Sequence, residues 1–384
     1  MIKDINVGIV ADWLATYAGS EKVVKEFIDL YPSSELYSII DYLSDSDRQL
    51  FHGKKANTTF IQNLPGARKK YQKYLPLMPL AIEQLDVSAH DVVLSSSHAV
   101  AKGIITSPDQ LHISYVHSPI RYAWDLQHQY LKAAGLDHGL KGMLAKWMLH
   151  KIRLWDYRTA NGVNNFIANS EFIARRIKKV YGREADVIYP PVDVERFVFN
   201  ENKDDYFFTA SRMVPYKRMD LIVEAFSQMP NKRLIVIGDG SEMKNIKSKA
   251  TKNIEILGYQ SDLVMQECMQ KAKAFVFAAE EDFGITPVEA QACGTPVIAF
   301  GKGGSLETVR PIGVNKATGI FFDKQEVSSL IDAIEKFTKI EDMINPLDCR
   351  ENSTRFSVNR FQKEMSEYVE TKWKEFSEAK KISY

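Results

Sequence analysis

The densest group of chemically useful residues lies in EEDFGITPVEAQACGTPVIAFGKGG, residues 280–304. Its acids Glu281 and Glu289 have seven residues between them, and a glycine pair, Gly303 and Gly304, closes the stretch. Two carboxylates can act as general acid and base, hold a metal ion, or bind the hydroxyl groups of a ligand. A glycosidase pair must flank a bond across a cleft, and this spacing does not specify such facing geometry.

A cationic pair lies earlier, in SRMVPYKRMD at residues 211–220. Arg212 follows a predicted strand and Lys217 precedes a predicted helix, so both would project from the loop at the strand's carboxyl end. A guanidinium fork and an ammonium group suit a diphosphate, and they would stabilise the charge that develops on its oxygens when a bond to it breaks. By spacing alone, a solvated basic turn explains the pair equally well.

A histidine follows a predicted strand in the first half, within YVHSPIRYAWD at residues 115–125. His117 could hydrogen-bond a ligand's hydroxyl group or share charge in a transition state, although a satisfied histidine in a turn is the commoner situation. Nearby Arg121, Trp124 and Asp125 combine a cation, an aromatic face and an acid. That mixture is common in sugar sites and also on ordinary surfaces, and it makes these three the acceptor-side candidates.

Glycine turns join strands to helices at Gly19 and at Gly303–Gly304. Glycine lets backbone amides approach a ligand, and a helix N-terminus favours an anion. Neither turn has the spaced glycines of a dinucleotide-binding fingerprint, nor does GDGSEM at 238–243, which weighs against a nicotinamide enzyme. The triplet Asp45-Ser46-Asp47 could hold a divalent cation, but its polar surroundings favour a helix-capping loop.

Alternating strands and helices must position these residues. Strand-like segments are predicted at 5–12, 91–97, 112–118, 163–170, 186–193, 205–211, 232–240, 254–258, 274–279 and 295–304. Helix-like segments are predicted at 20–31, 170–182, 219–229, 263–272, 286–294 and 356–381. This order predicts an α/β protein with two doubly wound, Rossmann-like parallel sheets, which bind ligands outside the carboxyl ends of their strands. We expect a first domain of residues 1–192 with a returning helix at 357–384, a second domain at 193–356, and a cleft between them.

Composition excludes several classes of protein. The chain has 384 residues, 45% of them apolar, and a net charge of +1, so bulk charge does not favour a nucleic-acid partner. Its three cysteines have no paired spacing and indicate reduced thiols in a cytoplasmic protein. We expect no signal peptide and no membrane span. Residues 64–82 interleave cations with tyrosines before an apolar run, so they predict either a peripheral membrane contact or a charged helix followed by a core segment.

The second half resembles glycosyltransferase family 4, the retaining enzymes of the GT-B architecture. The resemblance rests on the order and spacing of SRMVPYKRMDLIVEAF, LIVIGDG, LGY and EEDFGITPVEAQACGTPVIAFGKGGSLETV. It extends more weakly through AGSEKVV, YVHSP, FIANSEFIARRI and VIYPPVDVERF, and the closing FSVNRFQKEM resembles the family's crossover helix. Ala18 replaces the first glycine of the family's usual pair before Gly19.

The resemblance implies a role for each matching residue. Arg212 and Lys217 would bind the donor diphosphate, Glu281 a hydroxyl group of the donor hexose, and Glu289 the ribose. His117 would lie near the reaction centre. The remaining donor-side positions it implies are Gly19, Gly238, Tyr259, Phe283, Gly284, Ile285, Gly303 and Gly304.

The implied function is a metal-independent retaining hexosyltransferase without a cofactor. It would transfer a hexose from a nucleotide-diphosphate sugar to a saccharide or lipid-linked saccharide in cell-surface polysaccharide synthesis. We expect UDP-glucose first and GDP-mannose closely behind. A nucleotide-sugar epimerase and a non-catalytic nucleotide-sugar-binding protein remain the alternatives. The expected location is the cytoplasm or the cytoplasmic face of the membrane.

Overall fold

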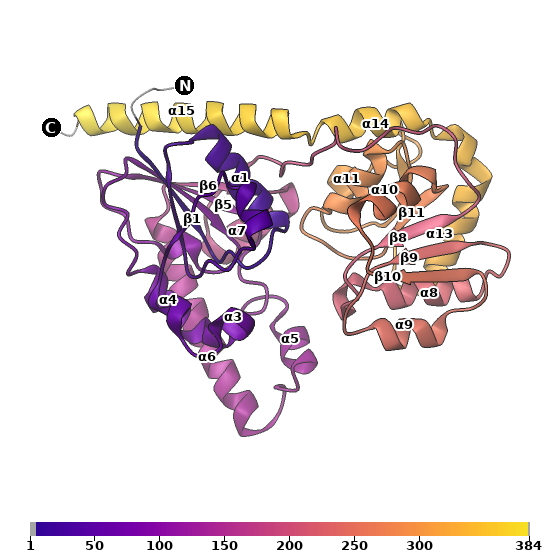
Figure 1. Cartoon of the computed structure of the whole chain (residues 1–384), viewed down its shortest axis with the longest axis horizontal. Coiled ribbons are helices and arrows are strands. Elements are labelled where there is room, and N and C mark those ends of the chain that lie inside the picture. The colour runs from indigo at the N-terminus through magenta and orange to yellow at the C-terminus, as the bar shows by residue number, and fades with distance from the viewer. Residues whose placement is uncertain (1–4, 383–384) are drawn as a thin grey trace. The chain divides into compact units, whose positions relative to one another are not determined.

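The computed structural model describes residues 5–382. The chain forms two compact units (Figure 1). The first unit runs to Pro191 and takes in the chain again from Phe361, and the second spans Val192–Arg360. Among the described residues, no helix is both long enough and apolar enough to cross a bilayer.

The first unit is built on a seven-stranded parallel sheet in the order β3-β2-β1-β4-β5-β6-β7. Its strands are β1 (Val7–Ala11), β2 (Glu35–Ser38), β3 (Asn57–Thr58), β4 (Val92–Ser97), β5 (Leu111–Val116), β6 (Asn165–Ala168) and β7 (Asp186–Val187). Residues of β1, β4 and β5 are buried throughout, as expected of strands covered on both faces. The sheet order reverses between β1 and β4, so the loops that follow these two strands are where a ligand would bind.

Helices and short 3₁₀ turns surround this sheet. They are α1 (Gly19–Leu30), α2 (Asp45–Gln49), η1 (Phe60–Asn63), α3 (Ala67–Lys70), η2 (Tyr71–Leu77), α4 (Met78–Ile82), η3 (Ala101–Gly103), α5 (Gln127–Ala133), α6 (Gly139–Thr159), η4 (Ala160–Gly162) and α7 (Glu171–Tyr181). The predicted ends of α7 are confirmed. The Ser170 side chain accepts a hydrogen bond from the Ile173 amide, and Gly182 adopts the left-handed conformation that stops the helix.

The second unit repeats the plan with six parallel strands in the order β10-β9-β8-β11-β12-β13. Its strands are β8 (Phe207–Ala210), β9 (Leu234–Ile237), β10 (Ile254–Gly258), β11 (Ala274–Phe277), β12 (Val297–Phe300) and β13 (Gly319–Phe322). Its helices and turns are η5 (Pro215–Lys217), α8 (Met219–Ser227), α9 (Met243–Lys249), α10 (Asp262–Lys271), α11 (Ile285–Ala292), α12 (Ser305–Thr308), α13 (Val327–Ile340), η6 (Glu341–Met343) and α14 (Pro346–Thr354). Here the order reverses between β8 and β11.

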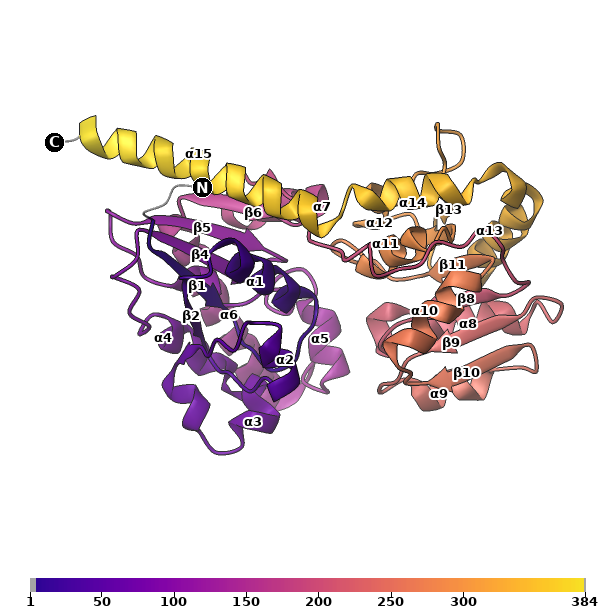
Figure 2. The ribbon, with the colours of Figure 1, turned by 45° about the horizontal axis from the view of Figure 1, so that its top comes forward.

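The last helix, α15 (Val358–Ile382), returns to the first unit, alongside which Figures 1 and 2 both draw it. Its predicted apolar face is confirmed, because Phe361, Met365 and Val369 are buried in the core of that unit. One predicted strand was too long: within 186–193 only Asp186 and Val187 join the sheet. The two prolines that follow at 190 and 191 have no amide hydrogen to donate to a neighbouring strand.

Candidate functional site

In the second unit, the predicted cations lie in the loop that follows β8, at the reversal of the sheet. Arg212 is exposed, and its guanidinium donates a hydrogen bond to the Tyr216 hydroxyl at 2.9 Å. Lys217 ends the η5 turn, and its ammonium forms an ion pair with the Glu281 carboxylate, which comes from the loop after β11. Both side chains of this pair are partly buried, so water screens their attraction less than at an open surface. The structure therefore brings Lys217 and Glu281 together from loops 64 positions apart.

Glycines let the loops of this site pack against each other. A Cβ atom on Gly303 would lie 2.4 Å from the Glu281 carbonyl oxygen, and one on Gly304 would lie 2.3 Å from the Phe283 Cα atom. The Gly304 amide donates a hydrogen bond to the same Glu281 carbonyl at 2.8 Å. The glycine pair thus fixes the backbone that carries Glu281, in addition to any part it takes in binding a ligand.

The N-terminus of α11 completes this group. Gly284 precedes the helix with a φ of +88°, which glycine adopts without strain, and Ile285 is the first helical residue. The Phe283 ring is buried against the ring of Phe356, with 5.3 Å between the centroids. The first amides of α11 have no partner within the helix, and the helix dipole adds positive potential there. An anion or a ring hydroxyl beside Glu281 would meet both.

Glu289 lies about one turn after Ile285 in α11 and is almost fully buried. One of its carboxylate oxygens is 3.5 Å from an Arg196 guanidinium nitrogen. Arg196 also pairs with Asp262 at 3.2 Å and stacks over the Phe197 ring. Arg196 was not predicted from the sequence, because it precedes the first strand of the unit and nothing in its neighbourhood marks it as a partner of Glu289.

Two further predicted donor-side residues follow β9 and β10. Gly238 has a φ of +146°, and a Cβ atom there would lie 1.9 Å from the carbonyl oxygen of Ser211, next to Arg212. Tyr259 follows β10 and is 83% exposed, so its ring is available to a ligand. Both residues therefore lie on loops at the carboxyl edge of the sheet, as expected.

A buried polar network holds α11 in place. The Asn352 amide of α14 donates hydrogen bonds to the Gln291 side-chain oxygen at 2.7 Å and to the Thr308 carbonyl at 2.8 Å. Gln291 in turn donates to the same Thr308 carbonyl at 2.9 Å. Satisfied networks of this kind make the arrangement of a buried region unique. The network ties α11 and α12, the two helices that follow the Glu281 loop and the glycine pair, to α14.

In the first unit, Gly19 is the first residue of α1, one position before the predicted start of that helix, and the loop before it follows β1. The Glu21 carboxylate accepts hydrogen bonds from the Ala18 amide at 3.1 Å and from the Ser20 hydroxyl at 3.0 Å. Burial raises the pKa of Glu21, although these donors and the charge on His98 oppose the shift. The α1 N-terminus thus carries a carboxylate of its own beside Gly19.

His117 follows β5, and its Nε2 atom lies 2.8 Å from the Ser96 hydroxyl at the end of β4. Burial, and then the charge on His98, lower the pKa of His117 to about 3. A neutral imidazole can exchange hydrogen bonds with a hydroxyl group but carries no charge near neutral pH. This state favours hydroxyl binding over charge sharing for His117.

Beside His117 lies a network that was missed from the sequence. The Asp12 carboxylate accepts hydrogen bonds at 2.5–3.0 Å from four consecutive backbone amides, those of residues 98–101, and lies 2.9 Å from the His98 Nδ1 atom. Burial opposes ionisation of Asp12, but His98 and these amides outweigh it and lower its pKa. Burial likewise opposes the His98 imidazolium, but Asp12 outweighs it and raises the pKa of His98. Asp12 ends one predicted strand and His98 directly follows another, and these positions could have marked them.

The acceptor-side candidates have structural partners. The Trp124 indole donates a hydrogen bond to the buried Asp156 carboxylate at 2.7 Å, and Asp125 forms an ion pair with Arg176 at 2.5 Å. Arg121 lies in the turn between β5 and α5 and is partly buried. These contacts fix the 117–127 loop, so the sugar-binding role of the three residues stays a prediction.

The Asp45-Ser46-Asp47 triplet forms the first turn of α2, and the Ser44 hydroxyl caps that helix by accepting a hydrogen bond from the Asp47 amide. The helix-capping interpretation is thereby confirmed. In the described part of the chain, no group of three or more His, Cys, Asp or Glu side chains is placed to hold a metal ion.

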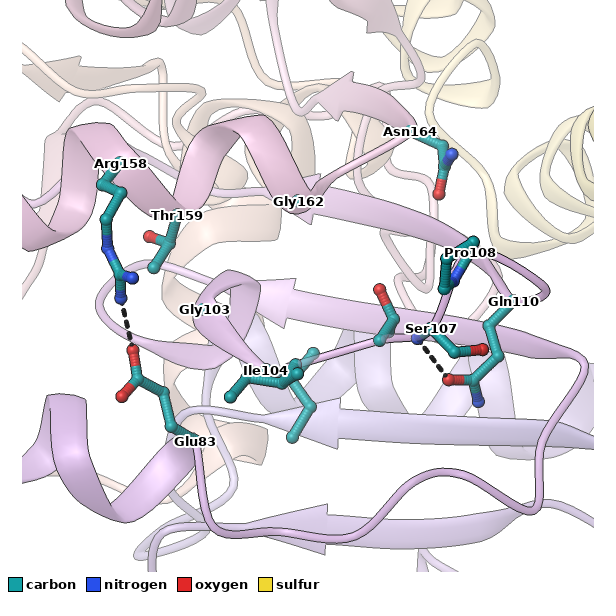
Figure 3. A pocket seen from close by; sticks show the side chains of 12 residues that line it. Glu83, Gly103, Ile104, Ser107, Pro108, Gln110, Arg158, Thr159, Gly162 and Asn164 are labelled. Atoms are coloured by element: carbon teal, nitrogen blue, oxygen red, sulfur yellow. Dashed lines mark hydrogen bonds and ion pairs between the residues drawn. The ribbon is translucent and has the colours of Figure 1, made fainter.

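A cavity of about 570 Å³ opens in the first unit, and neither Gly19 nor His117 lines it (Figure 3). Gln110 and Asn164 line it, and they directly precede β5 and β6. The cavity therefore lies at the amino edge of the sheet, opposite the edge that carries Gly19 and His117. The Glu83–Arg158 ion pair, at 2.8 Å, forms another part of its wall.

Two family models match the chain. Residues 19–196 match the model described as Glycosyltransferase Family 4, and residues 192–356 match the model described as Glycosyl transferases group 1.

Two curated relatives illustrate the sequence similarity. An uncharacterized glycosyltransferase of Methanocaldococcus jannaschii is 28% identical over 225 residues, which cover 57% of this chain and 62% of that protein. A GDP-mannose-dependent monoacylated alpha-(1-6)-phosphatidylinositol monomannoside mannosyltransferase of Corynebacterium glutamicum is 30% identical over 196 residues, 43% of this chain and 50% of that protein. The chain spans about half the length of the curated relatives it matches.

Solved structures show the fold. Anabaena HepE in complex with UDP has a TM-score of 0.71 at 16% identity, with 96% of this chain and 100% of that chain covered. Sucrose-phosphate synthase from Thermosynechococcus elongatus also has a TM-score of 0.71, at 14% identity, with 95% of this chain and 98% of that chain covered. The predicted α/β architecture of two Rossmann-like domains is confirmed.

Proposed function

The chain belongs to the family 4 glycosyltransferases of the GT-B fold, and from that premise we propose that it transfers a hexose from a nucleotide-diphosphate sugar with retention of anomeric configuration. One observation carries the proposal: the Lys217–Glu281 ion pair stands beside the α11 N-terminus, at the reversal of the second sheet. A cation, a carboxylate and the amides at a helix N-terminus are groups that can bind a sugar diphosphate within one site.

The proposed mechanism uses these groups without a protein nucleophile. Lys217, together with Arg212, stabilises the negative charge that grows on the diphosphate as its bond to the sugar breaks. Glu281 accepts a hydrogen bond from a hydroxyl group of the hexose. The acceptor attacks from the face that the diphosphate leaves, and a departing phosphate oxygen takes the acceptor's proton. His117, held neutral, would exchange a hydrogen bond with a hydroxyl group.

Two donors lead the candidates. From the sequence alone, UDP-glucose is expected first because it is a common donor. The Corynebacterium relative, whose name states GDP-mannose dependence, is 30% identical to this chain over the matched residues. The HepE structures with UDP and with UDP-glucose are only 16–17% identical, so they show the fold alone. We therefore place GDP-mannose first and UDP-glucose second. The acceptor we propose is a saccharide or lipid-linked saccharide of cell-surface polysaccharide synthesis.

We also propose that the reaction needs neither metal nor cofactor, and that it takes place in the cytoplasm or at the cytoplasmic face of the membrane. Peripheral contact through residues 64–82 would rest on the cations of α3, since Arg68, Lys69 and Lys70 are exposed. The apolar run that follows supports the alternative interpretation of this segment in part, because Met78 and Ile82 lie in the core.

A panel of sugar nucleotides tests the proposal, first by thermal shift and then by turnover with and without a chelator. A donor that binds the folded state raises the melting temperature. Transfer to a saccharide acceptor in the presence of chelator is the expected result, and activity restored only by a divalent cation would overturn metal independence. Isomerisation of the donor alone would identify an epimerase, and binding without any chemistry would identify a sensor. No response to any donor would refute the proposal.

A further inference from the structure

The helix α6 of the first unit exposes an unusual number of large apolar side chains. Those that are 54–84% exposed are Leu140, Met143, Leu144, Trp147, Leu154 and Tyr157. The first four follow the i, i+3, i+4, i+7 spacing of one helical face, and Leu154 continues that face two turns later. A contiguous apolar surface of this kind marks an interaction site more often than a chance exposure.

These side chains are not needed for the fold of the unit. The opposite side of α6 already packs inward through Ile152 in a small core with Ile120 and Ala123. Asp156 on the same inner side is buried and paired with Lys102 at 2.9 Å. The outer apolar face is therefore additional to the side of α6 that packs inward through Ile152 and Asp156.

The exposed charges on α6 are all positive. The helix carries exposed Lys141, Lys146 and Lys151, its exposed Arg158 is paired with Glu83, and its single acid, Asp156, is fully buried. The chain as a whole has a net charge of only +1, so this concentration of cations is local. An apolar face flanked by cations is complementary to a surface with an apolar interior and anionic headgroups.

Aromatic and lysine side chains on this face match the same partner. Trp147 and Tyr157 have amphipathic rings of the type enriched at the level of the headgroups. The Lys151 ammonium lies 5.6 Å from the centre of the Trp147 ring, and its long stem can cover apolar surface while its charge reaches the headgroups. A symmetric pairing of two α6 faces would instead place like charges against each other without an exposed acid on the helix to balance them.

We infer that this outer face of α6 docks on a bilayer that contains anionic phospholipid. The inference deepens the proposed function, because it makes a lipid-linked acceptor, presented at the membrane, the substrate class that the first unit is built to meet. The basic segment at 64–82 packs on the inner side of α6 instead, since Leu75 of η2 and Leu149 of α6 contact the same small core. The apolar part of the contact thus comes from α6, and so do the cations that flank it.

Flotation of the full chain with phosphatidylcholine vesicles, with and without phosphatidylglycerol, tests this docking. We expect binding that requires phosphatidylglycerol and weakens with salt. The double variant Met143→Gln, Leu144→Gln should bind at least about tenfold more weakly, because two apolar side chains no longer enter the bilayer. Met343→Gln, Leu347→Gln is the matched control, since it changes an equally exposed methionine and leucine in the second unit.

Charge reversal tests whether the cations of α6 contribute to the docking. Lys141→Glu, Lys151→Glu should lower binding to the anionic vesicles by about fivefold or more for each cation, while Lys244→Glu, Lys247→Glu on α9 should not. Vesicles should also shift the tryptophan fluorescence of the parent to the blue, and Trp147→Phe should abolish that shift.

Two results would overturn the inference: a parent chain that does not float with phosphatidylglycerol, or α6 variants that bind like their controls. Loss of a dimer on sedimentation in the Met143→Gln, Leu144→Gln variant, without any vesicle binding by the parent, would assign the face to a second copy instead. Flotation uses no substrate, so its failure is distinguishable from failure of the transferase assay. Donor binding measured by thermal shift should be the same in all these variants.

Discussion

At the scale of single residues, Lys217 and Glu281 are each other's counter-charge as well as the proposed ligands of diphosphate and sugar. Lys217→Ala should lower kcat by about 10²–10³, because a cation placed for the charge of the transition state is lost. Glu281→Gln keeps the size of the side chain and a hydrogen-bond acceptor, so it should lose less than Glu281→Ala. Steady-state turnover with saturating donor measures both effects, with exposed Lys252→Ala as the control. Near-parental rates in both alanine variants would remove the pair from the site.

His112 supplies a second prediction at this scale, on pH and stability. It is fully buried beside the Ser95 hydroxyl at 2.8 Å, and burial lowers its pKa to about 4 from an ordinary value near 6.5. The unfolded chain therefore binds more protons at this residue between those two pKa values. The stability that the neutral imidazole contributes is complete above about pH 6.5 and is lost as the pH falls towards 4, by about 3 kcal/mol in total.

Urea unfolding followed at several pH values checks this prediction. The variant His112→Gln retains a polar partner for Ser95 but cannot titrate, so its free energy of unfolding should fall less steeply between pH 6.5 and 4. His117 contributes in the same direction, with a pKa of about 3. His98, whose pKa is raised, contributes in the opposite direction and at higher pH. Equal slopes for the parent and His112→Gln would contradict the prediction.

At the scale of elements, the loop after β8 depends on a glycine from the loop after β9. Gly238→Ala would place a methyl group 1.9 Å from the Ser211 carbonyl oxygen and would strain a φ of +146°. The Arg212 loop must then move, so we expect weaker donor binding, about tenfold or more in KM, with a smaller effect on the melting temperature. Gly162→Ala adds the same methyl group where no atom lies within 4 Å and is the control. Unchanged donor KM in Gly238→Ala would show that the loop adapts.

The elements that the sequence predicted well have one clear period. The sequence predicted the strands β1, β4 and β12, because each is a short β-branched run that is buried on both faces. It also predicted the helices α1, α7 and α15, because each has apolar residues on one face only. Helix α6 was not found. Its inner and outer faces both carry apolar residues, so no helical period stands out over residues 139–159.

Contacts between distant loops were predictable only in part. The sequence placed Arg212 and Lys217 between a strand and a helix, and the structure places them in that loop, but the contact of Lys217 with Glu281 was not predicted. The Asp12 hydrogen bonds reach backbone amides 86–89 positions away, and the Arg196–Glu289 pair spans 93 positions. Such partners are brought together by the order of the strands in the sheet, and that order cannot be read from the sequence.

At the scale of the whole molecule, each unit has its own sheet and core, and the first unit is closed by a helix that the chain adds after the second. The order of the family blocks predicted this return, because a helix after the last strand of the second domain resembled the crossover helix. The spacing of the apolar residues predicted which face of α15 is buried. These residues recur on one side of the helix, and that side packs in the core of the first unit.

The packing of α15 on the first unit can be tested at Phe361. Phe361 is fully buried, stacks on the Phe27 ring with 6.2 Å between centroids, and meets the Tyr115 ring edge-on at 5.9 Å. Phe361→Ala should therefore destabilise the first unit by about 3–5 kcal/mol, although Phe361 follows the whole second unit in the chain. Phe337→Ala removes an equally buried ring from the core of the second unit and serves as the matched variant.

The tryptophans make the two units separately measurable. The chain has five, at positions 13, 124, 147, 155 and 373, and all five belong to the first unit. Thermal unfolding followed by tryptophan fluorescence thus reports the first unit, whereas calorimetry reports both. Phe361→Ala should lower the fluorescence transition, and Phe337→Ala should lower a calorimetric transition while moving the fluorescence transition less. If both variants shift the two signals by equal amounts, the units unfold as one cooperative body, and α15 is then part of a core that extends through the chain rather than the closing element of one unit.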